Sequence, residues 1–223
     1  MPSISLIRRK LQGFVLPENA LIPPGIDLRS ALATNSTWER ARFVDSRFGV
    51  ADFSRSRFLD VVFSDCAAPL AQMGGCSFEG CAFVDCDLEQ AVFVGSVFRD
   101  VQFVRCRLAY SSFAGATLRD GIHFNDCNMH GADVDFLENH GAVFEHCNLW
   151  GAKASLGCQF YNSEFDARTC DRFTAMVARL HPDPVKRAKL EELAGRELGP
   201  VKRLMDRRIP EEGAWPKPEE KEE

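Results

Sequence analysis

Nine cysteines and five histidines are the side chains of this 223-residue chain that could bind a metal ion or act as nucleophiles. A zinc site needs thiolates and imidazoles that converge from short, characteristic spacings. Five of the cysteines instead recur about twenty residues apart, which is too long and too regular for such a motif: Cys66, Cys86, Cys106, Cys127 and Cys147. The cysteine spacing therefore indicates a repeating structure rather than a metal centre.

The other candidates for chemistry are isolated. Cys170 alone among the cysteines lies outside the repeat described below. His123, His130, His140 and His146 are neighbours in sequence but fall on outward positions of different faces of that repeat. The chain contains no GxSxG element, phosphate-binding loop or dinucleotide glycine pattern. We therefore expect a protein that is not an enzyme and that has no cofactor and no metal.

Large apolar residues recur at every fifth position over a long run of the chain. A small or β-branched residue stands two positions before each of them, which is a second periodicity. A period of five matches neither a helix nor a strand. It fits a chain that turns a corner every five residues, so that four pentads make one square coil. The large residues are Phe43, Phe48, Phe53, Phe58, Phe63, Phe78, Phe83, Leu88, Phe93, Phe98, Phe103, Leu108, Phe113 and Leu118.

Residues one coil apart must then stack, about 4.8 Å from one another as in any β-ladder. With single-residue insertions near Gly121 and Gly157, one face stacks phenylalanines and another stacks small residues. We predict an all-β, quadrilateral solenoid of about seven coils over residues 26–167. The two columns are Phe43, Phe63, Phe83, Phe103, Phe124, Phe144 and Phe165, and Ala51, Ala71, Ala91, Ser111, Ala132 and Ala152.

The pentads are variants of the pattern A(D/N)LXX. Ala51-Asp52-Phe53, Ala132-Asp133-Val134 and Cys147-Asn148-Leu149 are examples. In this pattern the chain resembles the pentapeptide-repeat family. The resemblance implies a right-handed β-helix. It leaves the function open, because members range from scaffolds to proteins that bind DNA gyrase and protect it from inhibitors.

Both ends of the chain depart from the repeat. Residues 1–25 are expected to form an N-terminal cap, and residues 210–223 a disordered acidic tail. Residues 168–209 have apolar side chains at helical spacing, so we expect short C-terminal helices that cap the last coil or join two chains. The C-terminal end joins two rods in gyrase-binding relatives, which favours a homodimer. The apolar residues are Phe173, Met176, Val177, Leu180, Val201, Leu204 and Met205.

Two segments weaken the pattern inside the rod. Residues 66–75 contain Pro69 and small residues at a core position, which indicates either a local kink or a protruding loop. Residues 135–141 put Asn139 where a core residue belongs, so they form either a binding loop or a surface bulge. The candidate loop comprises Phe136, Leu137, Glu138, Asn139 and His140.

Acidic residues gather on the rod and form two lines along it. Residues 26–167 carry 19 Asp and Glu against 11 Lys and Arg, within a chain of net charge −5. Carboxylates in rows can imitate DNA phosphates, and the resemblance implies DNA gyrase or topoisomerase IV as the partner. The alternative for the rows is that Asp is favoured at corners, where it can bond a nearby backbone NH. The lines are Asp45, Asp65, Asp85 and Asp126, interrupted by Arg105, and Asp60, Asp100 and Asp120.

A second function class stays open, namely a scaffold or regulator with another protein partner. Such a scaffold would use outward apolar residues such as Val44, Val84 and Val104, or the C-terminal helices. No apolar run is long enough for a membrane helix, and the N-terminus lacks the pattern of a signal peptide. We expect a cytoplasmic protein with no membrane contact and no direct binding to nucleic acid.

Overall fold

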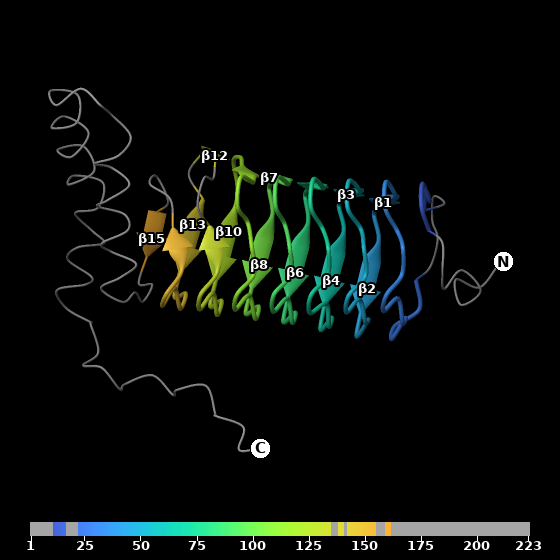
Figure 1. The fold of residues 1–223 in the computed structure, drawn as a ribbon, viewed down its shortest axis with the longest axis horizontal. Coiled ribbons are helices and arrows are strands. Elements are labelled where there is room, and N and C mark those ends of the chain that lie inside the picture. The colour runs from blue at the N-terminus through green and yellow to red at the C-terminus, as the bar shows by residue number, and fades with distance from the viewer. Residues whose placement is uncertain (1–10, 17–21, 135–137, 141, 155–158, 162–223) are drawn as a thin grey trace, which may run out of the picture.

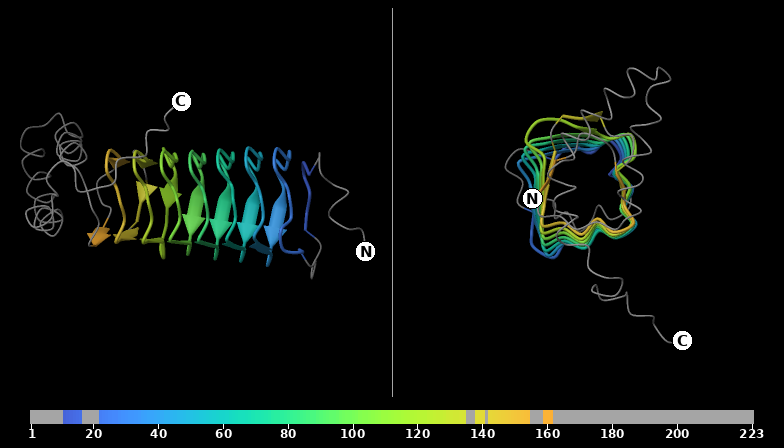
Figure 2. Two further views of the ribbon diagram at one scale, coloured as in Figure 1. Left: turned by 90° about the horizontal axis from the view of Figure 1, so that it is seen from below. Right: turned by 90° about the vertical axis from the view of Figure 1, so that its left-hand side faces the viewer.

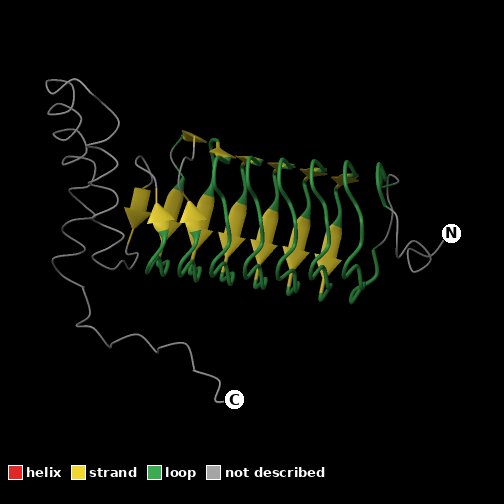
Figure 3. Cartoon of the chain, viewed as in Figure 1, coloured by secondary structure: helices red, strands yellow, loops and turns green. Residues whose placement is uncertain are grey.

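The computed structural model describes residues 11–16, 22–134, 138–140, 142–154 and 159–161. Over these residues the chain winds into a parallel β-solenoid, which runs as a rod in Figure 1 and has a four-sided outline when viewed end-on in Figure 2. The described part of the chain contains strands and turns but no helix (Figure 3). The predicted β-solenoid is confirmed.

Two sides of the coil are regular parallel sheets. A six-stranded sheet has the order β1-β3-β5-β7-β9-β12, and a seven-stranded sheet has the order β15-β13-β10-β8-β6-β4-β2. The six strands are β1 (Thr37–Glu39), β3 (Arg57–Leu59), β5 (Ser77–Glu79), β7 (Val97–Arg99), β9 (Thr117–Leu118) and β12 (Glu138–Asn139). The seven are β2 (Arg42–Val44), β4 (Val62–Ser64), β6 (Ala82–Val84), β8 (Gln102–Val104), β10 (His123–Asn125), β13 (Val143–Glu145) and β15 (Gln159–Tyr161).

The other two sides are held mainly by single-residue bridges. Arg47, Ala67 and Asp87 form one such ladder, while Asp52 and Gln72 belong to the other. Near the C-terminal end the second ladder becomes a short pair of strands, β11 (Asp133–Val134) and β14 (Lys153–Ala154). Within the described residues, neighbouring coils are therefore hydrogen-bonded to one another along all four sides.

The core consists of stacked rings. Phe103 is fully buried, and its ring lies parallel to those of Phe83 and Phe124 at centroid distances of 4.9 and 4.7 Å. These distances equal the spacing of paired strands, so each coil contributes one ring to the column and the rings stack directly on one another. Burial of the small residues two positions earlier, such as Ala51 and Ala91, confirms both inward positions of the pentad.

The prediction that Phe165 follows Phe144 in the phenylalanine column is wrong. Phe144 pairs with Phe160, not with Phe165, because Val143–Glu145 aligns with Gln159–Tyr161. Every other pair of strands joins residues 20 or 21 positions apart, whereas this pair joins residues 16 apart. The period of the upstream coils therefore does not extend to the last described coil, and Phe165 itself lies outside the described residues.

Each corner needs one residue with a left-handed backbone. The non-glycine residues at these positions have φ between 48° and 61°, a region that disfavours most side chains by about 1–2 kcal/mol and that Asp, Asn and Gly tolerate best. Asp65, with φ 54°, ends one side of its coil, and Gly75, with φ 65°, ends another. The pentad thus places Asp and Gly where the chain must turn.

The N-terminal end of the rod is covered by the chain itself. Leu11 and Leu16 are buried, and the Leu16 NH donates to the carbonyl of Thr37 at 2.9 Å. The ring of Phe14 lies 5.1 Å from that of Trp38. Residues 11–16 therefore close the first coil, while the boundaries predicted for the cap stay a prediction.

Residues 66–75 do not form a protruding loop, and residues 138–140 of the second irregular segment are paired with the previous coil. Ala68 and Met73 are buried, and the carbonyl of Pro69 accepts the NH of Val50 at 3.0 Å, so the ladder passes through residues 66–75 without interruption. Asn139 pairs in register with Leu118, and the flanking NH groups of residues 138 and 140 donate to the previous coil. Residues 135–137 lie outside the described part, as do the predicted C-terminal helices and tail.

Candidate interaction surface

The two predicted acidic lines lie on two adjacent corners of the rod. Asp60 follows strand β3 and Asp65 follows strand β4, so β4 lies between them within one coil. Asp100 follows strand β7 in the same way, whereas in the next coil Gly121 takes the left-handed position and Asp120 stands one residue before it. All seven aspartates are exposed. The lines therefore border one side of the rod, the face of the seven-stranded sheet.

The face between the lines carries little charge. Its outward residues in the middle coils are uncharged and partly or fully exposed. They are Val62 and Ser64 on β4, Ala82 and Val84 on β6, and Gln102 and Val104 on β8. This side thus presents two rows of carboxylates separated by a strip of neutral side chains.

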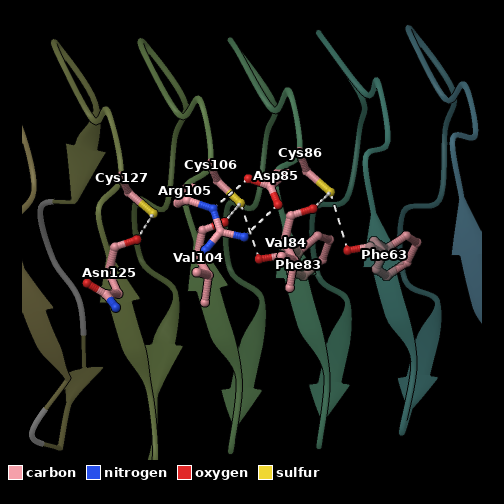
Figure 4. Close-up of polar contacts among 10 residues, drawn as sticks. All are labelled: Phe63, Phe83, Val84, Asp85, Cys86, Val104, Arg105, Cys106, Asn125 and Cys127. Carbon is pink, nitrogen blue, oxygen red and sulfur yellow. Dashed lines mark hydrogen bonds and ion pairs between the residues drawn. The ribbon is translucent and has the colours of Figure 1, made fainter.

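The charge of one line is interrupted by an ion pair between neighbouring coils. Arg105 donates two hydrogen bonds to the carboxylate of Asp85, from Nε at 2.7 Å and from Nη2 at 2.6 Å (Figure 4). Hydrogen bonding to this guanidinium lowers the pKa of Asp85 below its ordinary value. Farther along, Nδ1 of His146 lies 3.8 Å from Asp126. The line is strongest at Asp45 and Asp65, upstream of the pair.

Aspartate occupies these corners for a conformational reason. Asp45, Asp60, Asp65 and Asp100 all have positive φ, between 48° and 54°. The backbone bond that the sequence suggested for corner aspartates is made from another pentad position instead, where for example Asp52 accepts the NH of Ser54 at 2.9 Å. The left-handed backbone thus explains why Asp is found at corners. It does not explain why Asp is found at only two of the four corners.

Two aspartates of the second line lie against glycines of the next coil. A Cβ built on Gly80 would lie 2.5 Å from Oδ1 of Asp60, and one on Gly121 would meet the carboxylate of Asp100 in the same way. Both glycines have positive φ, at 62° and 75°. The carboxylates of Asp60 and Asp100 therefore each lie over a glycine of the following coil, where a side chain would collide with them.

The charge density of the two lines falls short of that of DNA. Seven aspartates and Arg105 leave six negative charges between Asp45 and Asp126, four coil steps apart. At about 4.8 Å per step this is roughly one charge per 3 Å of rod, against one per about 1.7 Å of duplex. The surface can imitate a phosphate backbone in sign and repeat, at about half the density.

The cysteine column is part of the core rather than a reactive site. Cys86 donates its thiol to the carbonyl oxygens of Phe63 and Val84, at 3.4 and 3.3 Å (Figure 4). Hydrogen bonding to the thiol of Cys106, together with burial, raises the pKa of Cys86 to about 12. All seven cysteines within the described residues are buried, and a buried thiol with a raised pKa, such as that of Cys86, stays protonated and unreactive at neutral pH.

Other sequence candidates are not brought together. His123 lies on strand β10, His140 follows strand β12 and His146 lies at the corner after strand β13, and the described ranges contain no group of three or more metal-binding side chains. Of the candidate loop, Glu138 and His140 are exposed, while Phe136 and Leu137 lie outside the description. Within the described ranges no helix has the length and hydrophobicity to cross a membrane. The predicted helical residues between 173 and 205 are likewise outside it.

One set of surface residues was not singled out from the sequence. Val50, Leu70 and Tyr110 occupy a third corner and are 57%, 45% and 53% exposed, with positive φ. The signal was available in the pentad itself, because these residues stand at the same corner position that carries Asp on the acidic lines. Sorting all four corner columns by residue type would have revealed it.

Comparison with known proteins identifies the repeat. A family model described as a pentapeptide repeat region matches residues 34–113 and 76–154, which together exceed half of the chain. A comparison with curated proteins gives no match.

Two solved structures are similar over most of the rod. HetL, a pentapeptide repeat protein involved in heterocyst differentiation regulation in the cyanobacterium Nostoc sp. strain PCC 7120, is 16% identical over 63% of this chain and 74% of its own, with a TM-score of 0.46. QnrB1, a plasmid-mediated fluoroquinolone resistance protein, is 15% identical over 71% of this chain and 97% of its own, with a TM-score of 0.38.

Proposed function

Because the chain belongs to the pentapeptide-repeat family, we propose that it is a non-enzymatic binding protein that imitates DNA toward a type II topoisomerase, either DNA gyrase or topoisomerase IV. Members of this family are generally binding proteins. The proposed effect on the topoisomerase is modulation, or protection from inhibitors, as in the gyrase-binding proteins that the repeat resembles.

The pair of acidic corners that borders the seven-stranded face is the observation that carries the proposal. Positive φ admits Asp at every corner, yet Asp lines only two of them, and those two are adjacent. A surface that binds a basic DNA saddle needs two parallel rows of negative charge with a neutral strip between them. The remaining corners, with residues such as Arg55 and Leu70, do not meet that need.

Binding would be electrostatic and therefore sensitive to salt. Exposed charges farther apart than about 8–10 Å are screened at physiological ionic strength, so only carboxylates in direct contact with the saddle contribute much. Asp45 and Asp65 should contribute most, because Asp85 is already neutralised by Arg105. The proposal includes a cytoplasmic location, where a topoisomerase is accessible, and a homodimer.

A scaffold with another protein partner is the second candidate. Val44 is 38% exposed at the N-terminal end of the face that the acidic lines border, and Val84 and Val104 recur in its column beyond Ser64. A DNA mimic needs only uncharged residues between its rows of carboxylates, whereas apolar side chains at these positions also suit a protein partner with an apolar ridge. Loss of function on Val44→Thr with the acidic lines intact would favour this second reading.

A supercoiling assay tests the proposal. Purified gyrase is assayed with and without a fluoroquinolone over micromolar concentrations of the protein, and we expect inhibition of supercoiling or protection from the drug. The variant Asp45→Asn/Asp65→Asn/Asp100→Asn should lose the effect while remaining folded, because Asn also adopts the left-handed conformation.

The control removes the same charge elsewhere. Asp52→Asn/Asp87→Asn/Glu89→Gln takes three negative charges from outside the two acidic lines and the seven-stranded face, and an amide oxygen can still accept the backbone bonds of Asp52 and Asp87. This variant should keep the effect. Wild-type protein without any effect on supercoiling or drug sensitivity would exclude a topoisomerase as the partner.

A further inference from the structure

The third corner of the rod carries apolar residues where the backbone disfavours them. Val50, Leu70 and Tyr110 have φ of 59°, 60° and 57°. A branched or aromatic side chain is least suited to this region, and Gly, Asn or Asp would suit it better. The aspartates of the acidic lines occupy this same position of the pentad at other corners, so the position accepts Asp. The apolar residues are therefore not required by the turn.

These side chains also contribute little to the core. Each is about half exposed, and Leu32 and Val94 on the adjoining side are 51% and 44% exposed. The ring of Tyr110 lies outside the coil, over Gly131 of the next coil and 5.2 Å from the ring of His130. The protein thus keeps strained apolar side chains on its surface without burying them, which is typical of a surface that is covered by a partner.

The side next to this corner is uncharged over its central coils. We call the corner and this side together the apolar strip. From Leu70 to Gly115 its outward residues include no Asp, Glu, Lys or Arg. They are Leu70, Gln72, Gly74, Gly75, Gln90, Val92, Val94, Gly95, Tyr110, Ser112, Ala114 and Gly115, and Leu32 and Val50 extend the strip toward the N-terminus.

The apolar strip faces away from the acidic lines. Along one coil the chain passes the seven-stranded face at Phe63, the corner at Asp65, the side centred on Ala68, the corner at Leu70 and then the strip at Met73. In a four-sided coil the sides at Phe63 and Met73 are opposite one another (Figure 2). A partner on the strip would therefore leave the acidic face open.

We propose that the apolar strip is where a second copy of this chain docks, with the two rods side by side and parallel. The rod segment carries a net charge of −8, so two copies repel one another unless they meet on a side without acidic residues. Between Leu70 and Gly115 the strip is such a side.

The charges at the N-terminal end of the strip fit this arrangement. Asp52 lies near the middle of its side, and Arg55 lies at the corner that ends that side. A two-fold axis that runs parallel to the rods and passes between these two positions places Arg55 of each copy opposite Asp52 of the other. The Arg55 side chain extends over Gly75, along the surface of the strip, with its Cγ 3.7 Å from the position a Cβ would take there. Antiparallel rods would not bring these two residues together.

Sedimentation equilibrium of the full chain tests the proposal. We expect a dimer at micromolar concentration for the wild type, and at least a tenfold higher dissociation constant for Leu70→Asn/Tyr110→Asn. The same variant should unfold at an equal or higher denaturant concentration, because Asn relieves the left-handed strain. The matched control, Val44→Thr, removes exposed apolar surface from the opposite side and should dimerise as the wild type does.

A charge exchange tests the parallel arrangement. Arg55→Asp should weaken the dimer about tenfold, and Asp52→Arg/Arg55→Asp should restore it. A monomeric wild type would overturn the proposal and leave the strip to a different partner. A Leu70→Asn/Tyr110→Asn variant that still dimerises would place the interface elsewhere, for example on residues 168–209. A variant that unfolds more readily would show that the strip stabilises the fold itself.

Discussion

Arg105 and Asp85 occupy the same corner position in successive coils, and the guanidinium of the first holds the carboxylate of the second through two hydrogen bonds of 2.7 and 2.6 Å. This pair divides the longer acidic line into an uncompensated part, Asp45 and Asp65, and a neutralised part. An exposed pair of this kind contributes little to stability. Its effect is on the shape of the surface charge.

The pair predicts a shifted titration for Asp85. Hydrogen bonding to Arg105 lowers the pKa of Asp85 in the folded protein. A lowered pKa means that the pair stabilises the fold above the ordinary carboxyl pKa of about 4 and ceases to do so as the pH falls through the folded value. Carboxyl NMR should show a pKa below the ordinary range in the wild type and a return toward it in Arg105→Asn. Arg107→Ala, on the next side of the coil, should leave it in place.

The ring column predicts a large effect at its centre. Phe103→Ala removes a fully buried ring that stacks on two others, so unfolding free energy should fall by about 3–5 kcal/mol. Glu89→Ala, which removes only an exposed ion pair with Arg107, should change it by less than about 1 kcal/mol. Chemical denaturation measures both, and equal losses would contradict the inward and outward assignment of the pentad.

The buried thiols predict a loss of stability in alkali. Burial raises the pKa of Cys76 to about 12 and that of Cys81 to about 11. Unfolded thiols ionise from about pH 8.5, so the unfolded state releases protons first and stability falls as the pH rises from there toward the folded values. Each thiol should account for a loss of about 2 kcal/mol between pH 7 and pH 10.

The control for this prediction uses residues already present in the same columns. Cys76→Ser copies Ser56 and Ser96, and Cys81→Val copies Val61 and Val101. In reducing buffer the double variant should lose about 4 kcal/mol less than the wild type over the same pH interval. Parallel pH profiles for the two proteins would mean that the thiols are not protected by the fold.

The repeat made most of the fold predictable, because each residue position has one environment in every coil. The burial of Phe103 and Ala91 follows directly from the five-residue period. The period could not predict the partner of Phe144, since the last described coil is shorter than the others and the phase of the upstream coils does not extend through it.

The candidate surface was predictable in position but not in charge. Asp85 and Arg105 were placed on one line from spacing alone, but their mutual neutralisation depends on side-chain geometry between coils. The exposed apolar corner was missed for a different reason. Leu70 and Tyr110 look ordinary in composition, and they become unusual only when their positive φ is known.

Displacement of DNA from gyrase tests the central claim most directly, namely that the two acidic corners bind where DNA binds. Labelled duplex bound to gyrase is titrated with the protein, and fluorescence anisotropy follows its release. Wild type should displace the duplex at micromolar concentration, Arg105→Asn should do so at a lower concentration because it frees Asp85, and Asp45→Asn/Asp65→Asn/Asp100→Asn should fail. Equal displacement by all three proteins, or none by the wild type, would contradict the claim.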